Sequence, residues 1–169
     1  MTKKITAPSL ILAFVLATFS IGYTYAHNKV VVVPLGADTS PTSFAVFAEG
    51  DQAEIVEAPD EVVVSVAITA PVDGVVIVNS SNAAEESTAA DGIRCSITTA
   101  SAISAAHLQF FKSAGVSGNR GQMSGTRGFN ILAGQTITYN LVCSHFGTGS
   151  TSSNITNSSL TATFTPAQS

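Results

Sequence analysis

The 169-residue chain contains no tryptophan, and Tyr139 is its only tyrosine beyond the apolar N-terminal segment. Sugar-stacking binding modules need exposed Trp or Tyr side chains, and Tyr139 lies at a position expected to face inward. A stacking site is therefore disfavoured, whereas shallow sites made of Phe or polar side chains stay open. The missing tryptophan also counts against immunoglobulin topology in detail, because those domains pack a Trp against their disulfide.

Basic residues are scarce as well. Without Lys3 and Lys4, which belong to the N-terminal segment, five Lys and Arg face eleven Asp and Glu, a net charge of −6. Nucleic acids and anionic lipids bind to basic surfaces, so neither is expected as a partner. The stretch from Gly128 to Ser169 has no charged side chain and is rich in Ser, Thr and Asn, as in many extracellular β-proteins.

The N-terminus has the pattern of a secretory signal peptide over residues 1–26. Lys3 and Lys4 precede the apolar stretch Leu10–Ile21, and small residues at Thr24 and Ala26 predict cleavage before His27. An uncleaved anchor is the alternative, although about 17 residues is the lower limit for spanning a bilayer. We expect an exported protein, secreted, periplasmic or at the cell surface, with no membrane contact after cleavage.

There are only two cysteines, Cys95 and Cys143. Cys95 shares one face of Ile93–Thr99 with two isoleucines, and Cys143 ends a segment in which Ile137, Tyr139 and Leu141 alternate with polar residues. Two strands that each direct one cysteine inward predict a core disulfide in an exported protein. No CxxC motif is present, so redox chemistry has no support.

Short alternating segments separated by turn residues predict an all-β protein, an antiparallel β-sandwich with jelly-roll or immunoglobulin-like topology. We expect this domain over residues 61–169, with Val62, Val64, Val66 and Ile68 inward in its first strand. The further strands expected are Gly74–Asn79, Ile93–Thr99, His107–Lys112, Phe129–Leu132, a strand ending at Cys143, and Ser158–Thr165. The connections expected are the polar segment Ser80–Ala90, with an extended part around Ala83–Thr88, and the loops Gly115–Gly128 and Ser144–Asn157. Thr99–Ala106 has room for one helical turn.

Residues 27–60 are expected to hold N-terminal strands and an acidic connector. The strands are Val30–Val33, an uninterrupted β-branched run, and Thr42–Ala48. Glu49–Glu61 carries six acidic residues and is interpreted as a solvated loop.

No catalytic residue, metal ligand or cofactor site is assigned from the sequence. GxSxG is absent, and the three histidines show neither HxH nor HxxxH spacing. Three weaker alternatives remain. The first is a copper site, because His27 at a mature N-terminus is able to chelate copper. The second is a calcium site made of oxygens from Glu85, Glu86 and Asp91, although these residues fit a solvated hairpin tip better. The third is a hydrolase with a dispersed site, which would need His107 or His145 to face an acid and a Ser or Thr hydroxyl across a cleft.

The segment Gly115–Gly128 combines five glycines with Arg120 and Arg127. Phosphate-binding loops lead into a helix N-terminus, whereas here a strand is expected to follow. The main interpretation is therefore structural, a series of turns and a bulge. The alternative is a ligand site for an anion, a sugar acid or another small molecule that uses Asn119, Arg120 and Arg127.

The run VVVVPLG after the signal segment, together with IRCSITT, GTRGF, YNLVC and SLTATFTP, resembles uncharacterised exported bacterial proteins with a VVVPLG-like start. A weaker likeness is to chaperone–usher pilus subunits, which are exported, one-disulfide sandwiches that accept a partner's strand. This likeness implies that Lys29–Val33 is a donor strand, although the chain lacks the penultimate Tyr of those subunits. We therefore expect a non-enzymatic exported sandwich that binds a protein partner, a glycan or a second copy of itself.

Overall fold

The computed structural model describes residues 43–50, 53–56, 59–86, 91–112, 119–147 and 152–167. The predicted signal peptide, His27 and Val30–Val33 lie outside these residues. Within the described part of the chain, no helix is long and apolar enough to cross a bilayer.

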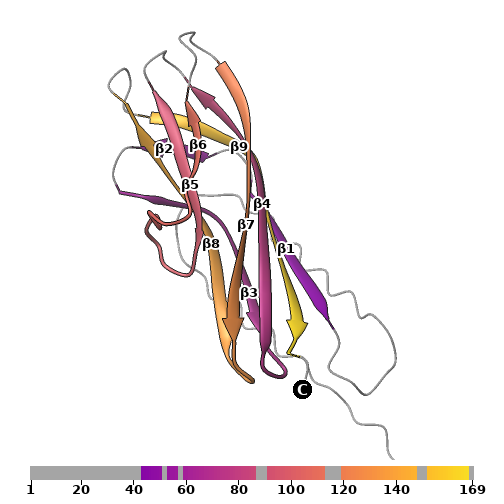
Figure 1. The fold of residues 1–169 in the computed structure, drawn as a ribbon. Coiled ribbons are helices and arrows are strands. Elements are labelled where there is room, and N and C mark those ends of the chain that lie inside the picture. Colours follow the sequence, from indigo (N-terminus) through magenta and orange to yellow (C-terminus); the bar gives the residue numbers. More distant parts are fainter. Residues whose placement is uncertain are drawn as a thin grey trace, which may run out of the picture.

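The described residues form nine strands in two antiparallel sheets that pack face to face (Figure 1), which confirms the predicted all-β sandwich. Sheet A has the order β1-β9-β4-β7, with β2 also paired to β9, and sheet B has the order β3-β8-β5-β6. The strands are β1 (Phe44–Gly50), β2 (Ala53–Val56), β3 (Glu61–Thr69), β4 (Gly74–Glu86), β5 (Gly92–Thr98), β6 (Gln109–Lys112), β7 (Asn119–Ile131), β8 (Thr136–Phe146) and β9 (Ser152–Pro166).

The strand order is that of a jelly roll, one of the two topologies expected. With β2 set aside, β1 pairs with β9, β3 with β8, β4 with β7 and β5 with β6. The eight strands therefore form one long antiparallel hairpin that is rolled up, and the pairings β4–β9 and β5–β8 join its turns within each sheet. Both β1 and β2 belong to sheet A, so the described part of residues 43–60 is a component of the sandwich.

The core lies between the two sheets and follows the alternation of each strand. On β9, Leu160, Ala162 and Phe164 are fully buried, as predicted, and on β8 the same is true of Tyr139, Leu141 and Cys143. Aromatic contacts run across the core, with the rings of Phe129 and Tyr139 4.8 Å apart between centroids. Burial of such side chains is the main source of stability in a sandwich of this size.

The predicted inward face of β3 is wrong at its first residue. The pairing of β3 with β8 shifts between Val62 and Val64, so Val63 is an extra residue in a β-bulge. As a result Val63 is buried, whereas Val62 is 40% exposed. The sequence VVV offers no contrast between inward and outward positions, and only the pairing with β8 decides among them.

The predicted loops are shorter than expected. β4 continues through Ser80 to Glu86, β9 begins at Ser152, and β7 begins at Asn119 within the glycine-rich segment. Part of the acidic connector is β2. The sequence pattern marks the extensions of β4, β7 and β9 only weakly, because many of their inward positions carry Ser, Asn, Glu or Gly, which hides the apolar alternation of a strand. Thr99–Ala106 contains no helix, but it ends in a hydrogen-bonded turn in which His107 N donates to the carbonyl oxygen of Ser104 at 3.2 Å.

Glycine within β7 has a packing role. Gly121 and Gly125 face β6, and a Cβ atom at either position would collide with the Phe111 ring or the Gln109 side chain, respectively. The two strands belong to different sheets, so these glycines allow the sheets to approach closely at this edge.

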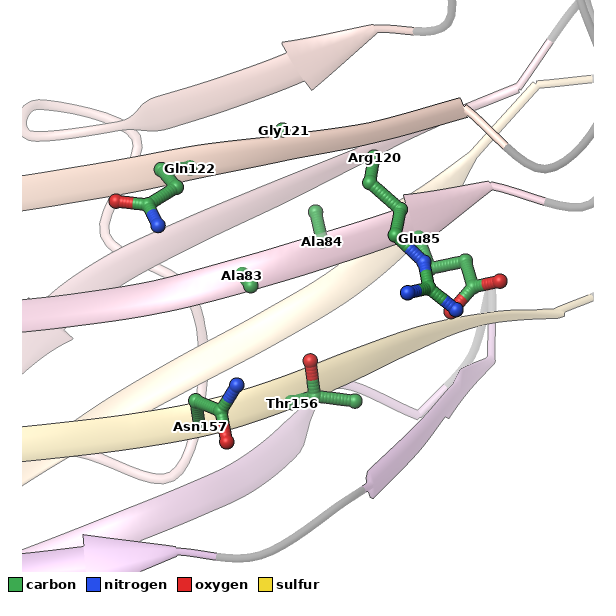
Figure 2. A pocket seen from close by; sticks show the side chains of 8 residues that line it. All are labelled: Ala83, Ala84, Glu85, Arg120, Gly121, Gln122, Thr156 and Asn157. Carbon is green, nitrogen blue, oxygen red and sulfur yellow. The ribbon is translucent and has the colours of Figure 1, made fainter.

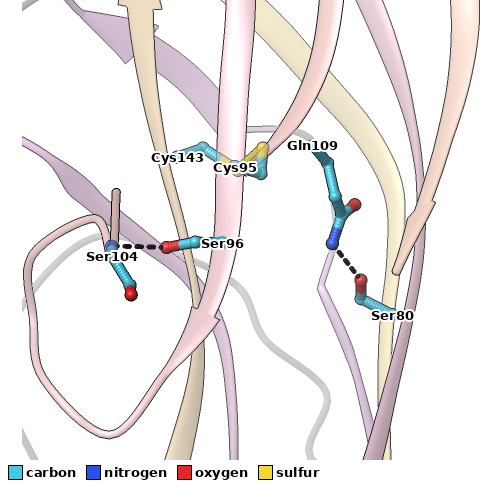
Figure 3. The surroundings of a disulfide bond; sticks show 6 residues. All are labelled: Ser80, Cys95, Ser96, Ser104, Gln109 and Cys143. Carbon is cyan, nitrogen blue, oxygen red and sulfur yellow. Dashed lines mark hydrogen bonds between the residues drawn. A yellow bond between two sulfur atoms is a disulfide. The ribbon is translucent and has the colours of Figure 1, made fainter. Parts of the chain in front are cut away.

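The disulfide Cys95–Cys143 joins β5 and β8, which confirms the predicted bridge (Figure 3). The two cysteines are directly paired in the sheet, with Cα atoms 4.1 Å apart, and both are fully buried. Nearby, Gln109 Nε2 donates a hydrogen bond of 3.0 Å to Ser80 Oγ and links β6 of sheet B to β4 of sheet A.

Replacing both Cys95 and Cys143 with Ala is expected to lower the free energy of unfolding by about 4 kcal/mol, since the bridge closes a loop between residues 48 apart. Urea unfolding followed by circular dichroism measures the change, with reduced wild-type protein as the control. Mass spectrometry of the non-reduced chain should show the bridge. Two free thiols in the wild type would contradict the pairing.

Tyr139 gives a second prediction, because its hydroxyl is buried without a hydrogen-bond partner and burial raises its pKa above the usual 10.0. The unfolded chain then releases this proton first, so stability falls as the pH rises above about 10. Tyr139→Phe should remove that fall and raise the free energy of unfolding by about 1 kcal/mol at neutral pH. Urea unfolding at neutral and alkaline pH tests both effects; an unchanged alkaline slope in the variant would refute the assignment.

Candidate functional site

The three residues predicted as a ligand site all lie on β7, but the structure does not bring them together. Successive residues of a strand point to opposite faces, so Asn119 and Arg127 lie on the inner side of sheet A and Arg120 on its outer side. The ligand-site alternative placed them in a glycine-rich loop, where such side chains are able to converge. In a strand, side chains on opposite faces are unable to converge on one site.

Arg127 acts as a tie between the sheets. Its Nη1 donates a 2.6 Å hydrogen bond to the carbonyl oxygen of Ile97 on β5, and its guanidinium lies 4.8 Å from the centre of the Phe129 ring. Both contacts are within the protein, and a cation over an aromatic face is itself stabilising. The geometry therefore assigns Arg127 to the scaffold.

Arg120 lines a hollow of about 490 Å³ on the outer face of sheet A. Figure 2 shows Gln122 of β7 and Asn157 of β9 on either side of Ala83, which forms the floor on β4, with Arg120 and Glu85 together at one end. The full lining is Ala83, Ala84, Glu85, Arg120, Gly121, Gln122, Thr156 and Asn157. Small residues below and long polar side chains around them create the depression.

A β-bulge in β9 shapes one wall of this hollow. The pairing of β4 with β9 shifts between Ser81 and Ala83, and Asn157 adopts a φ of 51° there. Asn is one of the few residues apart from Gly that tolerates this left-handed conformation. The bulge leaves Asn157 exposed beside the hollow and turns Ser158 into the core.

The charge of Arg120 is balanced within the hollow. Arg120 Nη2 lies 3.0 Å from Glu85 Oε2 on the directly paired strand position. The Arg120 side chain is 75% exposed, so the ion pair is well solvated and adds little to stability. The hollow therefore presents hydrogen-bond donors and acceptors without an excess of either charge.

A second group of polar side chains lies inside the sandwich, close to the hollow but on the inner side of sheet A. Glu86 at the end of β4, Asp91 just before β5 and His145 on β8 are all fully buried. One ligand-type atom from each of the three lies within 4.8 Å of the other two. The strand ends that carry them are at the end of the sandwich drawn uppermost in Figure 1.

The contacts within this buried cluster are incomplete. His145 Nε2 is 3.7 Å from Asp91 Oδ2, which is longer than a hydrogen bond, and neither ring nitrogen of His145 has a hydrogen-bond partner. Ser153 Oγ donates a hydrogen bond to Glu86 Oε2, whereas Glu86 Oε1 has no partner. Burial raises the pKa of the Glu86 carboxyl above its usual range, and the Ser153 hydrogen bond opposes this only in part.

The cluster differs from both arrangements considered for these residues. The solvated hairpin tip expected for Glu85, Glu86 and Asp91 is wrong for the last two, which are fully buried. Glu85, the third member of the calcium alternative, lies on the opposite face of β4 and pairs with Arg120. His145 does face an acid, as a dispersed hydrolase would require, but the Ser153 hydroxyl bonds Glu86 and the whole group is shut off from solvent. His107 is exposed beside a different hollow, near Arg127.

A signal for this cluster exists in the sequence. Every second residue of β8 points inward, so the pattern of Tyr139, Leu141 and Cys143 continues to His145. The same two-residue period, followed back from Cys95 through Ile93, reaches Asp91. Glu86 shares the inward face of β4 with Val76 and Val78. The strands predicted from the sequence end where the inward positions become polar, whereas the alternation of inward and outward positions continues through these polar residues.

In comparisons with known proteins, no protein family matches the chain, and no curated protein is significantly similar to it. The likenesses drawn from sequence motifs therefore stay predictions.

Proposed function

We propose that the chain is an exported, non-enzymatic binding protein whose ligand occupies the hollow around Arg120 on the outer face of sheet A. The observation that carries the proposal is the hollow itself, a depression of about 490 Å³ walled by charged, amide and hydroxyl side chains. Binding sites of this kind place a small number of polar groups around a concave surface.

The chemistry of the walls favours a neutral glycan. Gln122 and Asn157 are amides, and the Arg120–Glu85 pair offers a fork of N–H donors next to carboxylate oxygens. Each of these groups is suited to sugar hydroxyls, which both donate and accept hydrogen bonds. A sugar acid or phosphate would have to compete with Glu85 for Arg120, so we favour hydroxyl-rich ligands over anions.

Arg120→Ala should weaken glycan binding by about ten- to a hundredfold, the value of one or two hydrogen bonds to a charged group. A glycan array with the mature chain, followed by titration calorimetry on any hit, measures this. Arg127→Ala is the matched control, since Arg127 lies on the same strand but contacts Ile97 and Phe129 instead. Equal losses in both variants, or no loss in Arg120→Ala, would contradict the proposed site.

A second candidate function, assembly by strand donation, is favoured by the edge of sheet A. Among the described strands, the 13-residue β7 pairs only with β4, so one side of its backbone is left without a strand partner. Such edges accept an additional strand from another chain. The β-branched run within Lys29–Val33 has the composition of a donor strand.

Deletion of His27–Gly36 should convert oligomers of the mature chain into monomers, because it removes the proposed donor. Light scattering coupled to size-exclusion chromatography measures the mass. A variant with Val30–Val33 replaced by alternating Ser and Thr keeps the length and tests whether the apolar run itself is needed; a peptide spanning Lys29–Gly36 should compete with assembly. A mature chain that is monomeric both before and after the deletion would rule out this function.

A further inference from the structure

We propose that Glu86, Asp91 and His145 form a structural binding site for one divalent transition-metal ion of the zinc type. This site is separate from the hollow: Glu85 and Glu86 are neighbours on β4, but Glu85 faces outward to the hollow and Glu86 faces the core. The proposal therefore does not depend on the glycan function.

The spacing of the ligand atoms fits a metal ion better than a hydrogen-bonded network. Zinc bound at about 2.0–2.1 Å in a tetrahedral site holds its ligand atoms about 3.4 Å apart. The 3.7 Å between His145 Nε2 and Asp91 Oδ2 is too long for a hydrogen bond but close to that value. All three ligand atoms lie within 4.8 Å of each other, so binding of an ion requires only a small inward shift of the side chains.

Unsatisfied polar atoms point to a missing partner. Glu86 Oε1 and both ring nitrogens of His145 are fully buried and have no hydrogen-bond partner. Buried polar atoms without partners are costly, and native proteins keep few of them. A metal ion bound by Glu86 and His145 would satisfy an oxygen and a nitrogen at the same time.

The donor set and its charge select the class of ion. Two carboxylates and one imidazole carry up to two negative charges, which a divalent cation neutralises. An imidazole ligand favours zinc and its transition-metal neighbours over calcium, which prefers six to eight oxygen ligands. Calcium is therefore the comparison ion and zinc the expected one.

Two neighbouring contacts would hold the ligands in place. Ser153 Oγ donates to Glu86 Oε2, which restrains the carboxylate and leaves its other oxygen without a hydrogen-bond partner. Cys143 and His145 lie on the same face of β8, so the disulfide to β5 fixes this part of the strand next to Asp91. Contacts that orient metal ligands typically affect affinity by about 10–100-fold.

Because the ligands are fully buried, we expect the ion to enter as the chain folds and to leave slowly. The test therefore begins with mature chain unfolded in guanidinium without reductant, stripped with EDTA, and refolded with Zn²⁺, Co²⁺, Ca²⁺ or no metal. After desalting, elemental analysis should find one Zn²⁺ or Co²⁺ per chain and no Ca²⁺. The Co²⁺ form should show the visible absorption of a low-symmetry nitrogen and oxygen site, and its melting temperature should exceed that of the metal-free form.

Matched variants locate the ion. Glu86→Gln and His145→Gln should each lose the bound metal, whereas the same substitutions at Glu85 and His107, which lie outside the cluster, should leave the stoichiometry unchanged. Ser153→Ala should retain the ion but bind it about 10–100-fold more weakly. His27 is present in every variant, so metal held by a mature N-terminus would remain in all of them.

Wild-type protein that retains no zinc or cobalt after refolding would overturn the proposal. Equal metal content in wild type and His145→Gln would overturn it as well, since the ion would then be bound elsewhere. If the ligand variants fail to refold, as judged by near-ultraviolet circular dichroism, X-ray absorption of the wild-type zinc form decides: ligation by one imidazole and carboxylate oxygens supports the site, and any other ligand set refutes it.

Discussion

The pairing of β5 with β8, closed by the Cys95–Cys143 disulfide, is the constraint on which the rest of the structure depends. Both strands lie in the middle of sheet B, and their register sets Ile93 opposite His145 and Thr98 opposite Asn140. A shift of one residue would turn every core side chain of β8 toward solvent. The bridge prevents such a shift, so it maintains both the apolar core and the position of His145.

The sandwich divides along its length into an apolar part and a polar part. Between Phe164 and Leu160 on β9, the inward positions are apolar and close-packed. From the bulge at Asn157 and Ser158 onward, the inward positions of β4 and β9 include Asn82, Glu86 and Ser153 as well as Ser158 itself. Apolar packing alone accounts for the first part. The second requires hydrogen bonds or an ion to offset the burial of polar atoms, which makes this end of the fold the place to expect function.

The two candidate sites lie back to back across sheet A. The hollow uses the outward residues of β4, β7 and β9, and the buried cluster uses inward residues of β4 together with β8 and the start of β5. The alternation of β4 assigns Glu85 to one and Glu86 to the other. A metal ion in the cluster would tie the end of β4 to sheet B and so stiffen the strand that forms the floor of the hollow. The two proposals nevertheless have independent tests.

The sequence by itself determined the fold class, the core disulfide and the inward faces of β8 and β9, because alternation of apolar and polar residues marks the face of a strand that is buried. The tertiary structure alone decided the jelly-roll order, the bulge that exposes Val62, and the separation of Arg120 from Arg127. Strand order and bulges depend on pairing between distant segments, which local pattern does not encode. The same holds for the cluster: alternation places Glu86, Asp91 and His145 inward, but only the packing of three strand ends brings them within 4.8 Å of one another.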